Sequence, residues 1–408
     1  MNIIIGAGIS GLSAGHILAG KYRILEKTNC LGGLSGQYRV NGFAFDFGGH
    51  YFHFQNKAAI KELLEKFAVF KTHQRNSKIF MLQRFIPFSL QYHLAYLPVR
   101  LRKTVLQEIT MTQETQAGSL QEFLLNNFGK HLYDLFFKPF LFKFYGLPLT
   151  ELLAGMDKGS IPVPRQEEVM RGAVEKKHST EGYNPIFYYP QPSLQKFIEN
   201  YAQPVRHRIH FAERVERIDL REKKVFTNKD SYKYDNLINT MPLKEFLSIL
   251  DPLPPFAWQQ LKSLSTLVVN VVLARRRRHF HWLYLPEKDM PFYRVGYYPG
   301  QDMTAVYLEK TVAATERMDP EAIYMDMARV LHKTGMIEGH GEILFHDLKI
   351  IPVSYIVFDK HWPSLVPPAL EFLRRQRIYS IGRYGSWNYS SMADDVQMAL
   401  AAAALINQ

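Results

Sequence analysis

The sequence lacks several things that would define other classes of protein. A single cysteine, Cys30, among 408 residues excludes an internal disulfide and a zinc or iron–sulfur site built from cysteines. No apolar run approaches the roughly 20 residues that a membrane-spanning helix needs. No basic leader precedes the first apolar segment, so the sequence predicts a cytoplasmic protein without a signal peptide.

Several catalytic and binding signatures are missing as well. The chain contains no Walker-type phosphate loop, no His-Glu-x-x-His zinc motif and no Ser-His-Asp nucleophile pattern. It has no internal repeat, and no nucleic-acid-binding module accompanies its basic residues. We therefore expect neither a metal site nor a nucleic-acid partner.

The composition indicates a large globular protein with a basic balance. Hydrophobic residues make up 47% of the chain, enough for the cores of two or three domains. The formal net charge of +12 suits a small anionic substrate. Four consecutive arginines, Arg275–Arg278, are typical of a solvated turn between strands, and the alternative is peripheral contact with an anionic surface.

The first residues carry a glycine-rich turn in a defined context. Gly6, Gly8 and Gly11 have the spacing G-x-G-x-x-G, between an expected strand at 2–5 and an expected helix at 12–18. The first glycine permits the turn, the second lets backbone approach a pyrophosphate, and the third lets helix and strand pack closely. This arrangement predicts a dinucleotide site at a helix N-terminus.

The next strand supplies the group expected to bind a ribose. Residues 22–25 form a second apolar segment that ends at Glu26, about 20 residues after the first glycine. A carboxylate there accepts hydrogen bonds from ribose hydroxyls and disfavours a 2′-phosphate. Glu26 and the adjoining Lys27 are therefore predicted cofactor-binding residues.

The segments that follow resemble an FAD superfamily that contains amine oxidases, protoporphyrinogen oxidases and UDP-galactopyranose mutases. The resemblance rests on Gly32-Gly33-Leu34-Ser35-Gly36 and on Phe45-Asp46-Phe47-Gly48-Gly49-His50. It implies that Gly32, Gly33 and Leu34 pass beside the FAD diphosphate and that Gly49 leads to the flavin ring. FAD is then held without a covalent link, and any NAD(P)H would bind transiently as a reductant, because no second nucleotide fingerprint is present.

The resemblance continues at the other end of the chain. A strand at 377–381 ends in Gly382-Arg383, and Ser391 and Met392 stand at the start of an Ala-rich helix at 393–407. In the superfamily the N-terminus of this helix points at the flavin, which implies cofactor contacts from Arg383, Ser391 and Met392. Val215 resembles the position whose backbone meets the adenine, although an ordinary strand valine explains it equally well.

Within the superfamily, four ordered segments look most like the mutase branch. They are residues 48–50, 84–91, 282–294 and 382–389. The resemblance implies that His50 lies beside the isoalloxazine, that Gln91, Trp282 and Tyr284 line the substrate, and that Arg294 and Tyr389 bind its diphosphate. Arginine suits that role because its planar fork binds phosphate oxygens in pairs. Taken without the resemblance, Trp282, Tyr284 and Arg294 are better explained as core aromatics and a surface ion pair.

The same comparison shows departures from the mutase pattern. A second arginine of the mutases, on a loop, falls near Ser160, where Lys158 is the closest cation. The family's asparagine before a Lys-x-Trp is Leu141, and a usual glycine doublet is replaced by Gln191-Pro192-Ser193. These losses bear on the reaction and leave the predicted flavin site intact.

Three functions remain compatible with these residues. The first is a mutase-like enzyme, in which the reduced flavin N5 attacks the anomeric carbon of a nucleotide-diphosphate sugar and no net redox change occurs. The second is an oxidoreductase of the amine-oxidase or protoporphyrinogen-oxidase type that removes hydride from an apolar or amine substrate. The third is a flavoprotein that docks through Arg275–Arg278.

We expect an α/β fold of three interleaved parts. A Rossmann-like FAD-binding domain of the glutathione-reductase type would take residues 1–75, 190–245 and 370–408. A helical insertion would span 76–189, and a substrate domain on an antiparallel sheet would span 246–369.

Overall fold

The computed structural model describes the chain apart from five short stretches, at 112–115, 156–160, 177–183, 300–303 and 314–315. The chain divides into two compact units, each assembled from separate segments. The first unit comprises Met1–Thr72, Phe187–Ser263 and His361–Gln408. The second unit comprises His73–Ile186 and Leu264–Lys360.

The first unit is built on a five-stranded parallel sheet with the strand order β20-β13-β1-β2-β9. Ile3 and Ile4 of β1 and Leu237 and Ile238 of β13 are fully buried, as expected for strands covered on both faces. Its strands are β1 (Asn2–Ile5), β2 (Tyr22–Leu25), β9 (Ile209–His210), β13 (Leu237–Asn239) and β20 (Ile378–Ser380).

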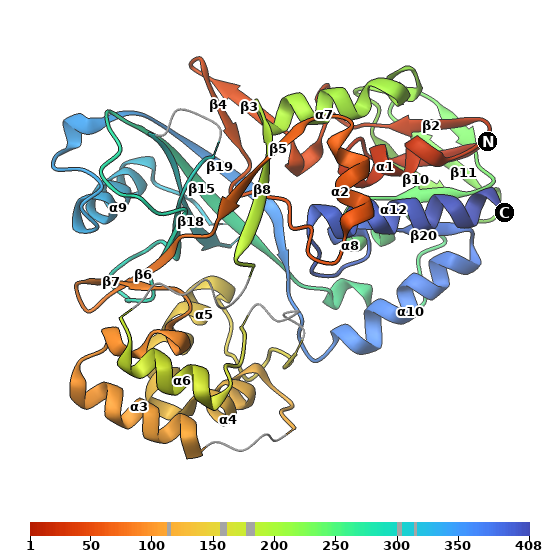
Figure 1. The fold of residues 1–408 in the computed structure, drawn as a ribbon. Helices are drawn as coiled ribbons and strands as arrows, with labels where there is room; N and C mark the ends of the chain where they lie inside the picture. The colour runs from red at the N-terminus through yellow and green to blue at the C-terminus, as the bar shows by residue number, and fades with distance from the viewer. Residues whose placement is uncertain (112–115, 156–160, 177–183, 300–303, 314–315) are drawn as a thin grey trace. The chain divides into compact units, whose positions relative to one another are not determined.

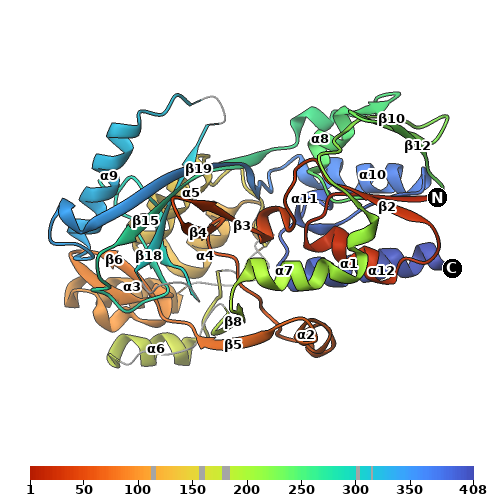
Figure 2. The ribbon, with the colours of Figure 1, turned by 90° about the horizontal axis from the view of Figure 1, so that it is seen from above.

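Two helices from opposite ends of the chain pack side by side in this unit (Figures 1 and 2). They are α1 (Ile9–Ile17) and α12 (Met392–Asn407). Small buried residues, including Ala14 of α1 and Ala399 and Ala403 of α12, allow their axes to approach closely. The last helix is thereby held beside the helix that follows the first strand.

The remaining elements of the first unit are short. A four-stranded sheet has the order β12-β11-β10-β14, and β3 and β4 form a hairpin. The strands are β3 (Gln37–Val40), β4 (Phe43–Asp46), β10 (Val215–Asp219), β11 (Lys224–Thr227), β12 (Ser231–Lys233) and β14 (Leu250–Asp251). The helices are α2 (Ala58–Glu65), α7 (Leu194–Ala202), α8 (Leu243–Ser248), α10 (Trp362–Arg375) and α11 (Gly382–Gly385).

The second unit is built on a seven-stranded sheet with the order β19-β15-β18-β17-β16-β6-β7. Its pairs β15–β18, β18–β17 and β17–β16 are antiparallel, and β16 pairs with β6 in parallel. The strands are β6 (Ser77–Met81), β7 (Arg84–Pro87), β15 (Ser263–Leu273), β16 (Trp282–Tyr284), β17 (Arg294–Tyr297), β18 (Ala305–Val312) and β19 (Ile343–Ile356).

Among its described residues, the second unit also contains the α-helices α3 (Val99–Met111), α4 (Leu120–Leu132), α5 (Lys138–Tyr145), α6 (Gln166–Val174) and α9 (Pro320–Lys333). Helix α9 buries Met327, Val330 and Leu331 in the core cluster that also contains Val269 and Leu308 of the sheet. Helix α5 contacts β18 (Figures 1 and 2).

The expected α/β fold is confirmed, but the chain forms two compact units where three interleaved parts were expected. Segments 76–189 and 246–369 were expected as separate parts, but most of both lies in the second unit. The reason is that β6 and β7, from the first of these segments, complete the sheet of the second. Strands β5 (Val69–Gln74) and β8 (Ile186–Gln191) pair where the chain passes between the units.

The expected elements agree with the observed ones where the apolar pattern is regular. The strand expected at 2–5 is β1, and the helix expected at 393–407 is α12, which begins one residue earlier. The long edge strand β19 was not predicted, because its apolar residues are interrupted by polar ones. Within the described part of the chain, no helix combines the length and the apolar character needed to cross a membrane.

Candidate functional site

The turn between β1 and α1 is shaped so that only glycine fits at two of its positions. Gly6 has a φ of +96°, in the left-handed region. A Cβ on Gly6 would collide with the Thr240 side chain, and one on Gly11 would collide with the Gly6 carbonyl oxygen. The chain therefore folds back on itself here with bare backbone on the surface of the turn.

No side chain among the described residues caps the N-terminus of α1. Gly8 is its N-cap and offers no side chain to the first-turn N–H groups. Among the described residues, none with an acidic side chain occupies the first turn of this helix. Free N–H groups and the positive end of the helix dipole favour an anion at this point.

A second glycine turn lies against the first. Gly32 and Gly33 have φ values of +98° and +55°. Gly8 and Gly32 form an isolated β-bridge, and the Gly32 N–H donates to the Ala7 carbonyl at 2.9 Å. A Cβ on Gly33 would lie 3.6 Å from the Gly8 Cα. The two turns thus present backbone to each other, as the diphosphate of a dinucleotide requires.

Glu26 lies at the end of β2, as predicted, and also fixes the first turn. Its side chain is buried, and Oε2 accepts the Ala7 N–H at 2.9 Å. Oε1 accepts the backbone N–H and the hydroxyl of Thr28. A carboxylate oxygen has two lone pairs, so Oε2 retains acceptor capacity for a ribose hydroxyl. Lys27 is exposed.

Val215 begins β10, two residues after Glu213, which is hydrogen-bonded to Glu26. The Glu213 N–H donates to the Glu26 carbonyl at 2.8 Å, which joins the start of this strand to the end of β2. Val215 itself is buried. Val215 therefore follows, by two residues, a residue that is bonded to Glu26, and its contact with the adenine stays a prediction.

The C-terminal segment meets the same helix start. Gly382 has a φ of +75°, and a Cβ there would collide with the Ser10 side chain of α1. Arg383 donates from Nε to the Ser390 carbonyl at 2.9 Å. Its guanidinium carbon lies 4.5 Å from the ring centroid of Tyr389. Residues from both ends of the chain therefore gather in the first unit.

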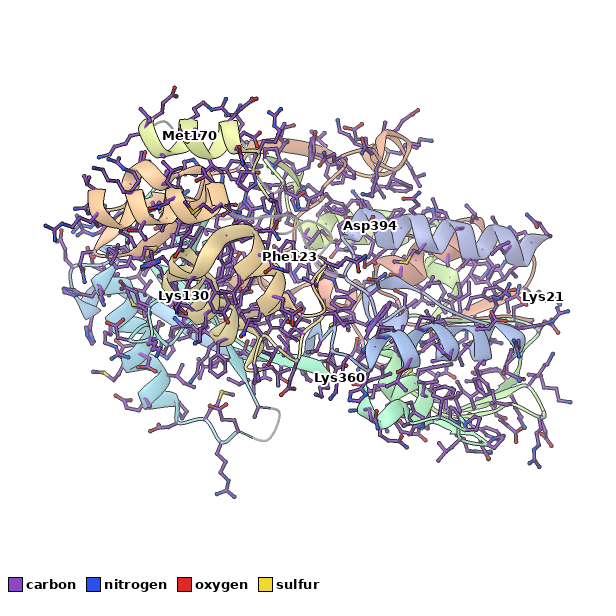
Figure 3. The ribbon with its side chains drawn as sticks, turned by 90° about the horizontal axis from the view of Figure 1, so that it is seen from below. Lys21, Phe123, Lys130, Met170, Lys360 and Asp394 are labelled. Carbon is purple, nitrogen blue, oxygen red and sulfur yellow. The ribbon has the colours of Figure 1, made fainter. Side chains whose placement is uncertain are left out.

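In contrast to α1, the N-terminus of α12 already carries carboxylates. Asp394 lies near the start of this helix (Figure 3). Ser391 caps the helix in a reciprocal pair with Asp394, which also forms an ion pair with Lys57 at 3.2 Å. Burial would raise the pKa of Asp394, but its bonds to Ser391 and Lys57 lower it below the usual value. Burial raises the pKa of Asp395 to about 6, against the hydrogen bond from Ser390. Met392 is buried beside them.

Asp46 is a buried carboxyl just before the segment that ends at His50. Its side chain is 1% exposed. The Gln37 Nε2 donates to one carboxyl oxygen at 2.6 Å, and the Tyr189 hydroxyl donates to the other at 3.0 Å. Burial raises the pKa of Asp46 to about 7, opposed by these two hydrogen bonds. His50 itself is half-buried in the same unit.

In the second unit, Arg294 begins β17 and forms an ion pair, but a buried one instead of the surface pair that the residues alone suggested. Its Nε donates to Glu309 of β18, which is 4% exposed, and its Nη2 donates to the Tyr355 hydroxyl at 3.0 Å. Burial lowers the pKa of Arg294, but the charge of Glu309, the neighbouring Tyr355 and Tyr307 and the hydrogen bond to Glu309 together outweigh it, so the net pKa is raised. Arg294 therefore remains cationic.

Trp282 and Tyr284 lie on β16, and Arg75 contacts both of them. The Arg75 Nη2 donates to the Tyr284 hydroxyl at 2.8 Å, and its guanidinium carbon lies 4.8 Å from the Trp282 ring centroid. Phe88 packs on Tyr284 with ring centroids 4.5 Å apart. Trp282 donates from Nε1 to the Tyr307 hydroxyl. The predicted aromatic pair is thus joined to a cation.

Gln91 is buried in the second unit. Its Nε2 donates to the Pro162 carbonyl at 2.8 Å. The described residues provide no hydrogen-bond partner for its Oε1, although that atom is also buried. A buried acceptor in this condition is suited to a ligand donor.

The residues that depart from the mutase pattern are placed as follows. Lys158 and Ser160 lie outside the described residues. Leu141 is buried in α5, so an apolar side chain suits its surroundings. Gln191 ends β8, and Ser193 caps α7 by accepting the Lys196 N–H.

The four arginines at 275–278 are engaged within the second unit. Arg275 and Arg277 form ion pairs with Glu338 and Glu342. Arg276 and Arg278 bond to backbone carbonyls and lie over the rings of Tyr297 and Phe85. Two carboxylates therefore compensate half of the charge, and contact with an anionic surface stays a prediction.

Sequence reasoning did not identify Asp46, Arg75, Lys143 or Glu309. Glu309 had a detectable signal, because it is the one acid within the apolar strand segment 304–309. Asp46 had a similar signal as a carboxylate in an otherwise apolar and glycine-rich motif. Arg75 had none, because its contacts come from residues far away in the sequence. Lys143 stands where the resemblance has the lysine of Lys-x-Trp, but its contacts with a loop 142 residues later had no signal in the sequence.

The sequence profile described as "Flavin containing amine oxidoreductase" matches residues 9–406. The chain is also similar to the solved structure of a reduced UDP-galactopyranose mutase, with 22% identity and a TM-score of 0.92. That match covers 100% of this chain and 95% of the other.

Two further structures extend the comparison. A putative protoporphyrinogen oxidase from Exiguobacterium sp. 255-15 is 16% identical, with a TM-score of 0.74, over 99% of this chain and 98% of the other. A cyclohexylamine oxidase from Brevibacterium oxydans IH-35A is 14% identical, with a TM-score of 0.68, over the same shares. At these identities the three structures establish the fold and leave the substrate open.

Proposed function

This chain belongs to the flavin containing amine oxidoreductase family, and on that premise we propose that it is a mutase-like enzyme acting on a nucleotide-diphosphate sugar or a similar anionic substrate. Its cofactor is FAD. When bound and reduced, the flavin would supply the nucleophilic nitrogen of such a reaction. The chain's own residues bind the cofactor, orient the substrate and stabilise its charge.

The glycine turns of the first unit are suited to the FAD diphosphate. Gly6, Gly8, Gly32 and Gly33 present backbone without side chains, and the start of α1 offers N–H groups to an anion. Glu26 is placed to accept a ribose hydroxyl, and Val215 adjoins it. We propose that Leu34, Gly49, Arg383, Ser391 and Met392 complete the contacts.

The observation that carries the substrate proposal is the pairing of β16 with β17. Tyr284 and Arg294 are direct cross-strand partners in this antiparallel pair. Side chains of directly opposed residues point to the same face of a sheet. A guanidinium that remains cationic therefore lies beside an aromatic ring, a combination that suits a phosphate and a flat base or sugar.

The remaining predicted residues are assigned by resemblance. We propose that Gln91 donates to or accepts from the substrate through its amide, and that Trp282 supplies an apolar wall. His50 and Tyr389 belong to the first unit, and we propose contacts to the flavin ring and to the substrate diphosphate, respectively. The enzyme is expected to act in the cytoplasm, and NAD(P)H is a candidate transient reductant for its flavin.

The test is an anaerobic titration of the flavin-loaded protein with UDP, UDP-galactose and UDP-galactofuranose, before and after reduction by dithionite. We expect a saturable change in flavin absorbance, and interconversion of the two sugars only in the reduced state. Arg294→Ala should abolish the change, whereas Arg374→Ala, on an exposed face of α10, should not. No response of the wild-type protein to any of the three would refute the proposal.

One observation favours the alternative of an oxidoreductase. Glu309 is buried against Arg294 and neutralises part of the charge that a diphosphate would need. A pocket with less net charge suits an apolar or amine substrate from which hydride is removed. Bleaching of the oxidised flavin by an amine or a porphyrinogen, followed by recovery in air, would establish this reaction instead.

A further inference from the structure

Lys143 is a buried lysine of α5 whose ammonium is directed at backbone carbonyls of one loop. Its Nζ donates to the Leu285 carbonyl at 2.6 Å, to the Glu287 carbonyl at 2.7 Å and, more weakly, to the Phe292 carbonyl at 3.4 Å. These carbonyls stand at the beginning, in the middle and near the end of the connection between β16 and β17. One side chain thus holds the whole loop, residues 285–293.

The loop that Lys143 holds separates two residues of the proposed substrate site. Tyr284 directly precedes Leu285, and Arg294 comes two residues after Phe292. The loop is also closed by its own backbone, because the Leu285 N–H donates to the Tyr293 carbonyl at 3.0 Å. A shift of the loop would therefore move both ends of the pair that binds the substrate.

The neighbouring residue of α5 reaches Arg294 from a second direction. Phe144 packs edge-on against Tyr293 and Tyr355, with ring centroids 5.0 Å and 4.8 Å apart. The Tyr355 hydroxyl accepts the hydrogen bond from Arg294. The Phe144 carbonyl accepts the Thr311 hydroxyl of β18, which fixes the end of the helix on the sheet. Helix α5 therefore holds the surroundings of Arg294 through two adjacent residues.

We propose that Lys143 is a positioning residue, which holds the loop 285–293 and through it sets Arg294 and Tyr284 in place for an anionic substrate. This inference rests on the proposed function, because Arg294 matters only if the substrate carries phosphate. An ammonium has three N–H groups and no acceptor, which matches three carbonyls and excludes competing donors. No other side chain type of similar length offers three rotatable donors from one atom.

The protonation of Lys143 gives the proposal a measurable signature. Burial lowers the pKa of Lys143 to about 8, and the nearby charges of Asp289 and Glu287 oppose this effect. Both of these carboxylates also face Lys333 of α9, which bonds to Asp289. Above that pKa the neutral amine has only two N–H groups, so one of its three carbonyls loses its partner.

The variants are Lys143→Met, Lys143→Arg and the control Lys310→Met. Methionine preserves the apolar stem and removes the three donors, whereas arginine keeps a charge in a planar shape that does not match three converging carbonyls. Lys310 lies on the neighbouring strand β18 with only a 3.9 Å ion pair to Glu316. Each variant is purified with FAD, and its flavin content and unfolding midpoint are compared with those of the wild type.

The first measurement is the dissociation constant for UDP, followed by flavin absorbance from about pH 6 to about pH 10. We expect Lys143→Met to bind UDP about tenfold more weakly at pH 7 and with little dependence on pH. The wild type should lose a smaller factor as the pH rises through about 8, because the neutral amine keeps two of its three donors, and Lys310→Met should follow the wild type. Lys143→Arg should restore less than half of the loss on a logarithmic scale.

The second measurement is hydrogen exchange of the loop amides without UDP. Faster exchange over 285–293 in Lys143→Met, with normal flavin content, is the expected result. Unchanged exchange, or unchanged UDP affinity despite faster exchange, would overturn the positioning role. A wild-type protein that never responds to UDP would overturn the proposed function and the assignment of Arg294, and the exchange data would then decide separately whether Lys143 holds the loop.

Discussion

The two units of this protein build their candidate sites in different ways. The first unit uses backbone: two glycine turns and a helix N-terminus, with few side chains involved. The second unit uses side chains from several strands and helices, such as Arg294, Glu309 and Tyr355. A backbone site tolerates almost no added atom, whereas a side-chain site depends on charge balance and on how loops are held.

The largest effect is expected from adding one atom to the backbone site. Gly11→Ala would place a methyl group against the Gly6 carbonyl, and overpacking of this kind costs about 1 to 3 kcal/mol and distorts the turn. We expect the purified variant to keep less than about a tenth of the wild-type flavin. Gly339→Ala is the control, because a Cβ there meets nothing within 4 Å. Normal flavin content in Gly11→Ala would contradict the backbone account.

The next largest effect concerns charge in the second unit. Arg294→Ala leaves the buried Glu309 without its partner, which costs about 3 kcal/mol of unfolding free energy. Urea denaturation followed by tryptophan fluorescence measures this loss, and the flavin content should stay close to that of the wild type. Adding Glu309→Gln should recover much of the stability without recovering the response to UDP. Equal loss in the single and double variants would show that the pair is not coupled.

A smaller effect is expected on the pH dependence of stability, through the buried carboxyl of Asp46 in the first unit. Its folded pKa of about 7 exceeds the ordinary value of 3.8, so between these values the folded state binds more protons than the unfolded state. Stability contributed by this group is therefore lost as the pH rises from about 4 to about 7.

Asp46→Asn imitates the protonated acid and removes this dependence. We expect the variant to match the wild type near pH 5 and to exceed it by about 1 to 2 kcal/mol near pH 8.5, in urea midpoints measured at each pH. Tyr189→Phe, which removes one donor to the carboxyl, should act in the opposite direction at high pH. A wild-type stability that is flat across this range would refute the assignment.

The smallest effect is expected on the arginine run. Arg275 is 61% exposed, and its ion pairs with Glu338 and Glu342 contribute less than about 1 kcal/mol. Arg275→Gln should therefore hardly alter the unfolding midpoint. Sedimentation with vesicles of anionic lipid tests the remaining prediction of surface contact, because loss of co-sedimentation in this variant would support it. Equal behaviour of variant and wild type would argue against such contact.

Features that depend on a few consecutive residues could be predicted from the sequence, and contacts between distant residues could not. The strand, turn and helix at 2–18 and the carboxylate at Glu26 were predicted because each requirement is local to a few consecutive residues. The family likewise followed from motifs at both ends of the chain. The burial of Glu309 beside Arg294 was not predicted, since it depends on how β17 and β18 are paired.

The sequence by itself determined a dinucleotide-binding turn, an FAD family and the residue types available for a substrate. Glycine spacing does this because the left-handed φ and the close approach of backbone are properties of single positions. Only the tertiary structure decided that Lys143 holds the loop before Arg294 and that Asp46 meets Tyr189. Those contacts join residues more than a hundred positions apart, and burial then changes their pKa values, which no local pattern records.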